Sequence, residues 1–172
     1  MNTATDQNRK LERDFYEPVK NWLDKILAEK FASHHLEVTA NGSFSNIIQK
    51  QIADHRDLIF AFLKKDAAPD LTGFVKKTDS LSREFLIVEM KNEPIKLDDI
   101  YQTRKYAELF DARYALLIST HEVPEKIIRL ARVMFPYLLA IPAYKKVTLV
   151  HFGKDGADVS WFESDPFAEA VK

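Results

Sequence analysis

The chain has 172 residues, a length typical of a single domain, and its formal net charge is −1. Hydrophobic residues make up 46% of the chain and charged residues 30%, the balance of an ordinary globular protein. The absence of cysteine excludes disulfides, thiolate zinc sites and cysteine nucleophiles, so any metal must be bound by oxygen or imidazole ligands. The net charge neither favours nor excludes a polyanionic partner, because acids elsewhere can offset a local basic patch.

Other classes of function lack their signatures. Residues 1–10 are polar, without the apolar segment of a signal peptide, and no apolar run approaches the roughly 20 residues that cross a bilayer. We therefore expect a cytoplasmic protein with no membrane partner. With four glycines the chain has no glycine-rich phosphate loop, which argues against nucleoside triphosphate hydrolysis. The five histidines form no ligand cluster in the sequence.

The N-terminal part of the chain predicts a helix and a strand, followed by a segment of open assignment. Apolar residues recur at helical spacing over Leu11–Phe31, and Pro18 inside this pattern either kinks one helix or begins a second. Residues His35–Ala40 are typical of a strand. Within Asn46–Lys65 the run Leu58–Leu63 could be a buried strand, but the length and the lack of turn residues favour a helix.

Strands and helices then alternate. Strands are predicted at Asp70–Lys77, Arg83–Lys91 and Arg113–Ser119. Helices are predicted at Asp98–Phe110, capped by Asp98 or Asp99, and at Pro124–Phe135.

The C-terminal pattern predicts a β-hairpin over about residues 144–162, with strands at Lys146–Phe152 and Ala157–Phe162. This order of elements predicts a single α/β domain in which helices flank a mixed central sheet.

The strand that ends at Lys91 is the most informative stretch. Alternate side chains share a face of a strand, so Glu89 and Lys91 point the same way at the end of a strand that is apolar on both faces. The alternative is that both emerge into solvent where the strand ends. Asp70 opens the preceding strand, and antiparallel pairing would place it beside Glu89. Two carboxylates at one spot form an oxygen site suited to Mg²⁺.

Pro69-Asp70 followed by Glu89-Met90-Lys91 resembles the motif of the PD-(D/E)XK nuclease superfamily. The resemblance implies Asp70 and Glu89 as metal ligands, joined by the Met90 carbonyl, for a Mg²⁺ or Mn²⁺ cofactor. It implies Lys91 as the catalytic partner of the attacking water.

The next helix extends the resemblance. Gln102 and Tyr106 match the Q-x-x-x-Y motif of RecB-like and archaeal Holliday-junction-resolvase-like members, and residues four apart share one helix face. The alternative is that Tyr106 packs in the core and Gln102 lies at its rim. The resemblance covers about residues 10–135 and implies a restriction-endonuclease-like αβββαβ core. Residues 46–65 then form an insertion, and the hairpin at 144–162 lies outside the core.

In this family the first helix often contributes an acid to the site. Glu12 lies on the inward face of the predicted helix, whereas Glu17 lies almost opposite the apolar stripe. Glu12 is therefore preferred, although a break at Pro18 would rotate the two halves of the helix. The alternative is that both are ordinary solvated acids.

Basic residues close to the site in chain order are predicted to bind the nucleic-acid backbone. They are Lys76, Lys77, Lys96, Arg104 and Lys105. A second possible group comprises Arg129, Arg132, Lys145 and Lys146. Solvated surface charge is the alternative for each, and phosphate binding would weaken steeply with salt.

Together these residues and the resemblance imply a metal-dependent nuclease that hydrolyses DNA phosphodiester bonds with a metal-activated water. Small nucleases of this family often pair as homodimers, and the resemblance alone suggests a homodimer here. The rival hypothesis is a catalytically inactive module of the same fold, used for nucleic-acid binding or protein assembly. The near-neutral charge favours the rival slightly. The combination of Asp70, Glu89 and Lys91 favours the enzyme.

Overall fold

The computed structural model describes residues 12–52, 68–78, 80–143, 145–153 and 156–168. Its centre is a seven-stranded mixed sheet of order β1-β2-β3-β4-β6-β5, with β7 paired to β6. The strands are β1 (Ser33–Val38), β2 (Leu71–Lys76), β3 (Glu84–Lys91), β4 (Tyr114–Ser119), β5 (Ala140–Ile141), β6 (Lys145–Phe152) and β7 (Val159–Trp161). Neighbours among β1, β2 and β3 are antiparallel, whereas β4 and β6 run parallel to β3.

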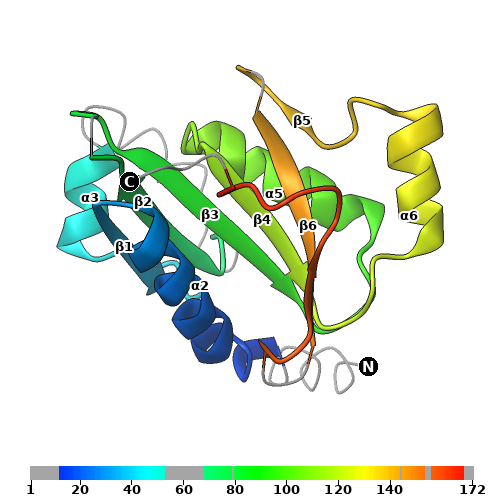
Figure 1. Cartoon of the computed structure of the whole chain (residues 1–172), viewed down its shortest axis with the longest axis horizontal. Helices are drawn as coiled ribbons and strands as arrows, with labels where there is room; N and C mark the ends of the chain where they lie inside the picture. The colour runs from blue at the N-terminus through cyan, green and yellow to red at the C-terminus, as the bar shows by residue number, and fades with distance from the viewer. Residues whose placement is uncertain (1–11, 53–67, 79, 144, 154–155, 169–172) are drawn as a thin grey trace.

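Helices cover both faces of this sheet (Figure 1). Helix α2 (Tyr16–Lys30) packs on one face. The other face carries α3 (Asn46–Ile52), α5 (Leu97–Leu109) and α6 (Glu125–Arg129), which continues into the π-helical turn η2 (Leu130–Met134). The predicted α/β architecture with a mixed sheet is confirmed. No helix in the described ranges is long and apolar enough to cross a membrane.

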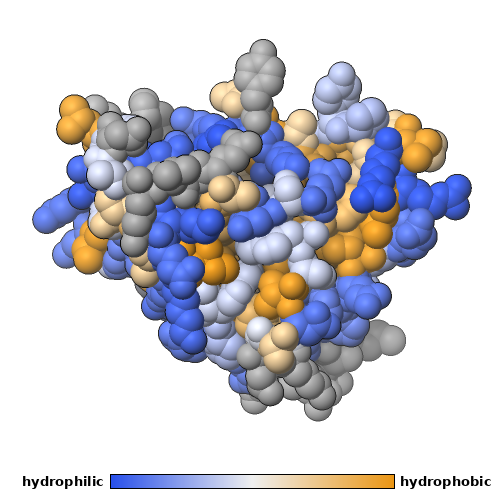
Figure 2. Space-filling view, viewed as in Figure 1, coloured by the Kyte–Doolittle hydropathy of each residue, from blue (hydrophilic) through white to orange (hydrophobic). Residues whose placement is uncertain are grey.

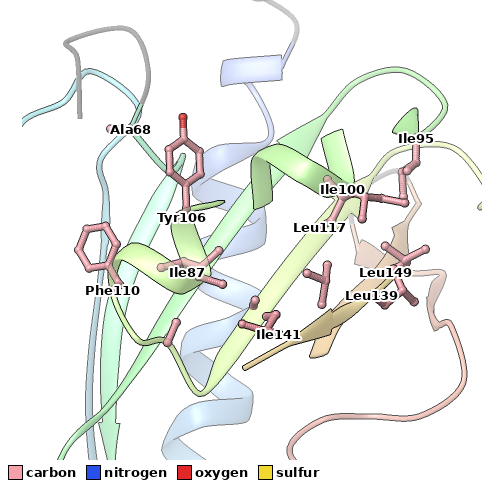
Figure 3. Packing of buried hydrophobic residues seen from close by; sticks show 14 of the residues in the cluster. Ala68, Ile87, Ile95, Ile100, Tyr106, Phe110, Leu117, Leu139, Ile141 and Leu149 are labelled. Carbon is pink, nitrogen blue, oxygen red and sulfur yellow. The ribbon is translucent and has the colours of Figure 1, made fainter. Parts of the chain in front are cut away.

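The alternation along β3 divides the core in two. Leu86 and Val88 are fully buried on the α2 face, and Ile87 is fully buried on the α5 face. Figure 3 shows part of the second cluster, in which Ile87 and Tyr106 lie together. A strand buried on both faces is typical of a sheet with helices on both sides. Any charged side chain on this strand therefore lies at the edge of a dry core.

The start of α2 decides between the two alternatives predicted at Pro18. The chain turns at residues 14–15, and α2 begins at Tyr16. A second helical segment therefore exists, but it starts two residues before Pro18. Pro18 lies in the first turn, where backbone N–H groups have no partner within the helix and none is lost to proline.

The segment between β1 and β2 begins as predicted. Helix α3 buries Ile48 and Ile52 in the α5-face core. The possible strand Leu58–Leu63 lies outside the described residues. The predicted cap of α5 at Asp98 or Asp99 is wrong, because the N-cap is Lys96. Asp99 instead accepts a hydrogen bond from the Lys96 backbone N–H at 2.8 Å.

The C-terminal hairpin exists, because β6 pairs antiparallel with β7. It does not stand apart from the sheet, however, since β6 lies parallel beside β4. The reason is that Val147, Leu149 and Val150 bury both faces of β6 completely. This strand could not be left at the surface, so it extends the central sheet.

Candidate active site

The pairing of β2 with β3 brings two carboxylates to one end of the sheet. Leu71 lies opposite Val88, and the same register continued by one residue places Asp70 opposite Glu89. Asp70 is 6% exposed and Glu89 is 3% exposed. The antiparallel arrangement inferred from the sequence thus places both acids where β3 ends.

A cavity of about 190 Å³ opens at this point. Its lining residues are Glu12, Arg13, Tyr16, Ala40, Ala68, Asp70, Glu89, Lys91 and Gln102. The cavity therefore brings together the three predicted catalytic residues and two of the three predicted accessory residues.

Glu89 is held by two donors on one side only. Its Oε1 accepts hydrogen bonds from Lys91 Nζ at 2.9 Å and from Gln102 Nε2 at 2.8 Å. Its Oε2 is buried without a hydrogen-bond partner among the residues described. Burial and the neighbouring Asp70 raise the pKa of Glu89 to about 8. Burial lowers the pKa of Lys91, but the carboxylates of Glu89, Glu12 and Asp70 together outweigh this effect and raise that pKa above its usual range.

Asp70 is fixed by two different donors. The Tyr16 hydroxyl donates to Asp70 Oδ1 at 2.7 Å, and the Met90 backbone N–H donates to Oδ2 at 2.7 Å. Burial raises the pKa of Asp70, and these two hydrogen bonds oppose the rise. Tyr16 is a site residue that was not predicted from the sequence, because an aromatic residue on the inward face of the helix fits an ordinary core position. Its position four residues after Glu12, on the same face, was the available signal.

The acid contributed by the first helical segment is Glu12. It lies half-buried in the cavity lining, with its Oε1 3.4 Å from the Tyr16 hydroxyl. Burial raises the pKa of Glu12, while Lys91 opposes the rise. Glu17 is exposed and is not among the lining residues. The helix break at residues 14–15 leaves Glu12 at the cavity.

Gln102 and Tyr106 form a short relay on α5. Gln102 contacts Glu89 directly, and its Nε2 also lies 3.3 Å from the Tyr106 hydroxyl. The Tyr106 ring is fully buried, and Figure 3 shows its hydroxyl pointing out of the apolar cluster. Burial raises the pKa of Tyr106 to about 12. Tyr106 thus packs in the core and reaches the site only through Gln102.

None of the predicted basic residues is among those that line the cavity. Lys76 ends β2, six residues after Asp70, and a strand of that length spans roughly 20 Å. Lys77 is 3.8 Å from Glu84, at the same far end. Lys76 and Lys77 are close to Asp70 in the sequence, but β2 is extended and places them at its opposite end.

The other basic residues lie around α5 and at separate places. Lys96, at the start of α5, forms an ion pair with Glu93 at 2.6 Å. Arg104 donates to the Leu138 carbonyl at 3.3 Å, and Lys105 lies 4.4 Å from the centre of the Tyr106 ring.

The second basic group is divided in the fold. Lys145 pairs with Asp111, and Lys146 pairs with Glu163 at 3.0 Å. Arg129 and Arg132 lie instead on α6 and η2.

The carboxylates of the cavity are of the chemical kind that a small, hard divalent cation takes as ligands. Mg²⁺ is commonly bound by one or two carboxylates and several waters. Asp70 and Glu89 are neighbours by register, and Glu89 Oε2 lacks a donor in the described structure. No group of three or more His, Cys, Asp or Glu side chains in the described ranges is arranged to hold a metal. A cation here would therefore rely on waters for most of its ligands.

Comparisons with family models, with curated proteins and with solved structures each returned no significant match.

Proposed function

We propose that this chain is a Mg²⁺- or Mn²⁺-dependent nuclease of the PD-(D/E)XK type that hydrolyses DNA phosphodiester bonds. The observation that carries the proposal is the single cavity lined by Asp70, Glu89, Lys91 and Gln102. The order α2-β1-β2-β3-α5-β4, with α3 inserted after β1, supports a restriction-endonuclease-like core. The Q-x-x-x-Y pair on α5 supports a RecB-like member, because its glutamine contacts the Glu89 carboxylate.

Each residue of the cavity has a distinct task in this proposal. A bound cation would polarise the phosphodiester and make an attacking water more acidic. Asp70 and Glu89 would hold it, with the Met90 carbonyl as a further oxygen ligand. Gln102 keeps one oxygen of Glu89 engaged and leaves Oε2 free of protein donors within the described structure.

Lys91 would act directly on the attacking water or on the phosphoryl oxygens. Its raised pKa keeps the ammonium protonated, and one of its three N–H groups is used on Glu89. The others can orient the attacking water or neutralise the negative charge that develops on the phosphoryl oxygens.

The test is a cleavage assay on duplex DNA, single-stranded DNA and RNA, with Mg²⁺, with Mn²⁺ and with EDTA. We expect metal-dependent cleavage of DNA. Lys91→Ala should lose at least about 100-fold in rate but still bind the metal in calorimetry. Lys77→Ala, at the far end of the sheet, is the matched control and should cleave normally.

The inactive-module hypothesis gives a different result. It predicts nucleic-acid binding without cleavage in either metal, and the net charge of −1 is the observation in its favour. Absence of both metal binding and cleavage in the wild-type chain would contradict the nuclease.

A further inference from the structure

A second surface lies on and after η2. Every residue from Arg132 to Tyr137 is exposed, and four of them are large and apolar. The exposed fractions are 76% for Val133, 71% for Met134, 57% for Phe135 and 80% for Tyr137. Extended apolar patches on monomers commonly mark interaction sites. We call the exposed residues of the range 126–137 the α6–η2 surface.

This surface is also positively charged. The sequence has no acidic residue from Lys126 to Lys154, although the whole chain has a net charge of −1. Within the described structure, the side chains of Lys126 and Arg129 form no hydrogen bond or ion pair. Arg132 lies 5.0 Å from the centre of the Phe162 ring and is exposed. A partner with negative charge and flat apolar groups would complement such a surface.

These side chains lie on the π-helical turn and on the three residues that follow it. The Phe135 N–H donates to the Leu130 carbonyl at 2.8 Å, which is the wider bond of a π-helix. Ala131 and Leu138 are buried on either side, so the residues between them face outward. Figure 2 shows apolar and strongly polar side chains next to each other over this segment, at the upper right.

The surface is connected to the helix that carries Gln102. Arg104 of α5 donates to the Leu138 carbonyl at 3.3 Å, just after the exposed segment. Tyr101, half-exposed on the outer side of α5, lies 5.9 Å from the Arg104 guanidinium. One helix thus contacts the cavity with Gln102 and, with Arg104, the residue that directly follows the α6–η2 surface.

We propose that the α6–η2 surface binds single-stranded nucleic acid. Unpaired bases would stack on Phe135 and Tyr137, and phosphates would lie beside Lys126, Arg129 and Arg132. The choice of nucleic acid as the partner rests on the proposed function. A second copy of the chain is a poorer occupant, because a two-fold contact would bring the same cations of both copies together.

The test measures fluorescence anisotropy of a labelled oligothymidylate of about 20 nucleotides in EDTA, where no metal-dependent cleavage occurs. Phe135→Ser with Tyr137→Ser should raise Kd at least about tenfold, as should Arg129→Ala with Arg132→Ala. The matched controls are Leu81→Ser, which removes a side chain that is 98% exposed on another surface, and Lys25→Ala on α2. Both controls should bind like the wild-type chain.

Other outcomes would overturn the inference. Unchanged binding by the aromatic pair would exclude stacking, and preference for duplex over single strand would exclude unpaired bases as the ligand. If the chain binds phosphatidylserine vesicles and the same variants abolish this binding, the surface is assigned to a membrane. If the chain self-associates in sedimentation and the same variants abolish the self-association, the surface is assigned to a second copy. If the wild-type chain binds the oligonucleotide as expected but cleaves no DNA with Mg²⁺ or Mn²⁺, the proposed nuclease activity is rejected and the proposed binding surface stands.

Discussion

The two ends of β3 carry the same residue type in opposite settings. At the start of the strand, Glu84 is partly exposed and lies 3.8 Å from Lys77 Nζ and 3.5 Å from the Tyr114 hydroxyl. At the end, Glu89 is 3% exposed. An ion pair like that of Glu84 contributes about 0–1 kcal/mol, whereas burying a carboxylate costs several kcal/mol unless charges and hydrogen bonds offset it.

The difference indicates that the buried carboxylate of Glu89 costs the folded state free energy that the exposed Glu84 does not cost. Its neighbour on β4 is Leu117, a fully buried apolar residue. A purely structural strand would continue in the same way, yet position 89 holds an acid opposite Asp70. Residues whose pKa is strongly perturbed by burial and by a like charge in a cavity are typical of functional sites. The other end of the strand therefore provides the control for the tests at Glu89 and Tyr16.

The largest difference between the ends should appear in catalysis. Glu89→Gln keeps the shape of the side chain and removes the charge that would hold the cation. Cleavage should fall at least about 100-fold, and Mg²⁺ affinity measured by calorimetry should fall with it. Glu84→Gln should leave both unchanged. Wild-type cleavage by Glu89→Gln would rule the mechanism out, whatever the fold.

Without metal, Glu89→Gln and Glu84→Gln should differ in how their free energy of unfolding depends on pH. The pKa of Glu89 is about 8 in the folded protein against 4.5 in the unfolded chain, so the folded state binds more protons between these values. The free energy of unfolding therefore falls as the pH rises through this window. Glu89→Gln should remove this loss and raise Tm over wild type near pH 9, but much less near pH 5.

Thermal unfolding in EDTA over this pH range measures the effect. Glu84→Gln should keep the wild-type slope. A wild-type slope in Glu89→Gln as well would show that the folded protein holds Glu89 with an ordinary pKa.

A smaller effect is expected at Tyr16, whose hydroxyl donates to Asp70. Tyr16→Phe removes a buried hydrogen bond and should cost about 1–3 kcal/mol of unfolding free energy. Cleavage should fall by about tenfold, because Asp70 loses one of the two donors that orient it. Tyr114→Phe is the control at the opposite end, where the hydroxyl lies 3.5 Å from Glu84. Equal cleavage by the two variants would leave Tyr16 with a structural role only.

The local sequence pattern was sufficient to predict the pairing of β2 with β3, which builds the cavity. Pro69-Asp70 and the apolar run ending at Lys91 identify two strands joined by a short connection, and adjacent strands of this kind pair antiparallel. The pairing alone places Asp70 opposite Glu89. The four-residue spacing on α5 likewise indicated that Gln102 and Tyr106 share one side of a helix.

Contacts between distant segments could not be obtained in this way. Tyr16 meets Asp70 across 54 positions of the chain, through the packing of α2 on the sheet. The separation of Lys76 from the cavity, and the insertion of β6 beside β4, are also set by the tertiary arrangement. Neither proximity in the sequence nor the type of each element predicts these tertiary contacts.

The smallest effect should be found at Tyr106, because its hydroxyl reaches Glu89 only through Gln102. Tyr106→Phe keeps the fully buried ring and should cost about 1 kcal/mol or less of stability. Gln102→Ala removes the donor to Glu89 Oε1, so it should slow cleavage about tenfold, and Tyr106→Phe should slow it less. Tyr106→Ala is unsuitable, since removing a buried aromatic ring costs about 3–5 kcal/mol by itself. Cleavage rates measured beside unfolding curves separate the two contributions. Wild-type rates in both Gln102→Ala and Tyr106→Phe would make the Q-x-x-x-Y match a coincidence and leave the nuclease proposal on β2 and β3 alone.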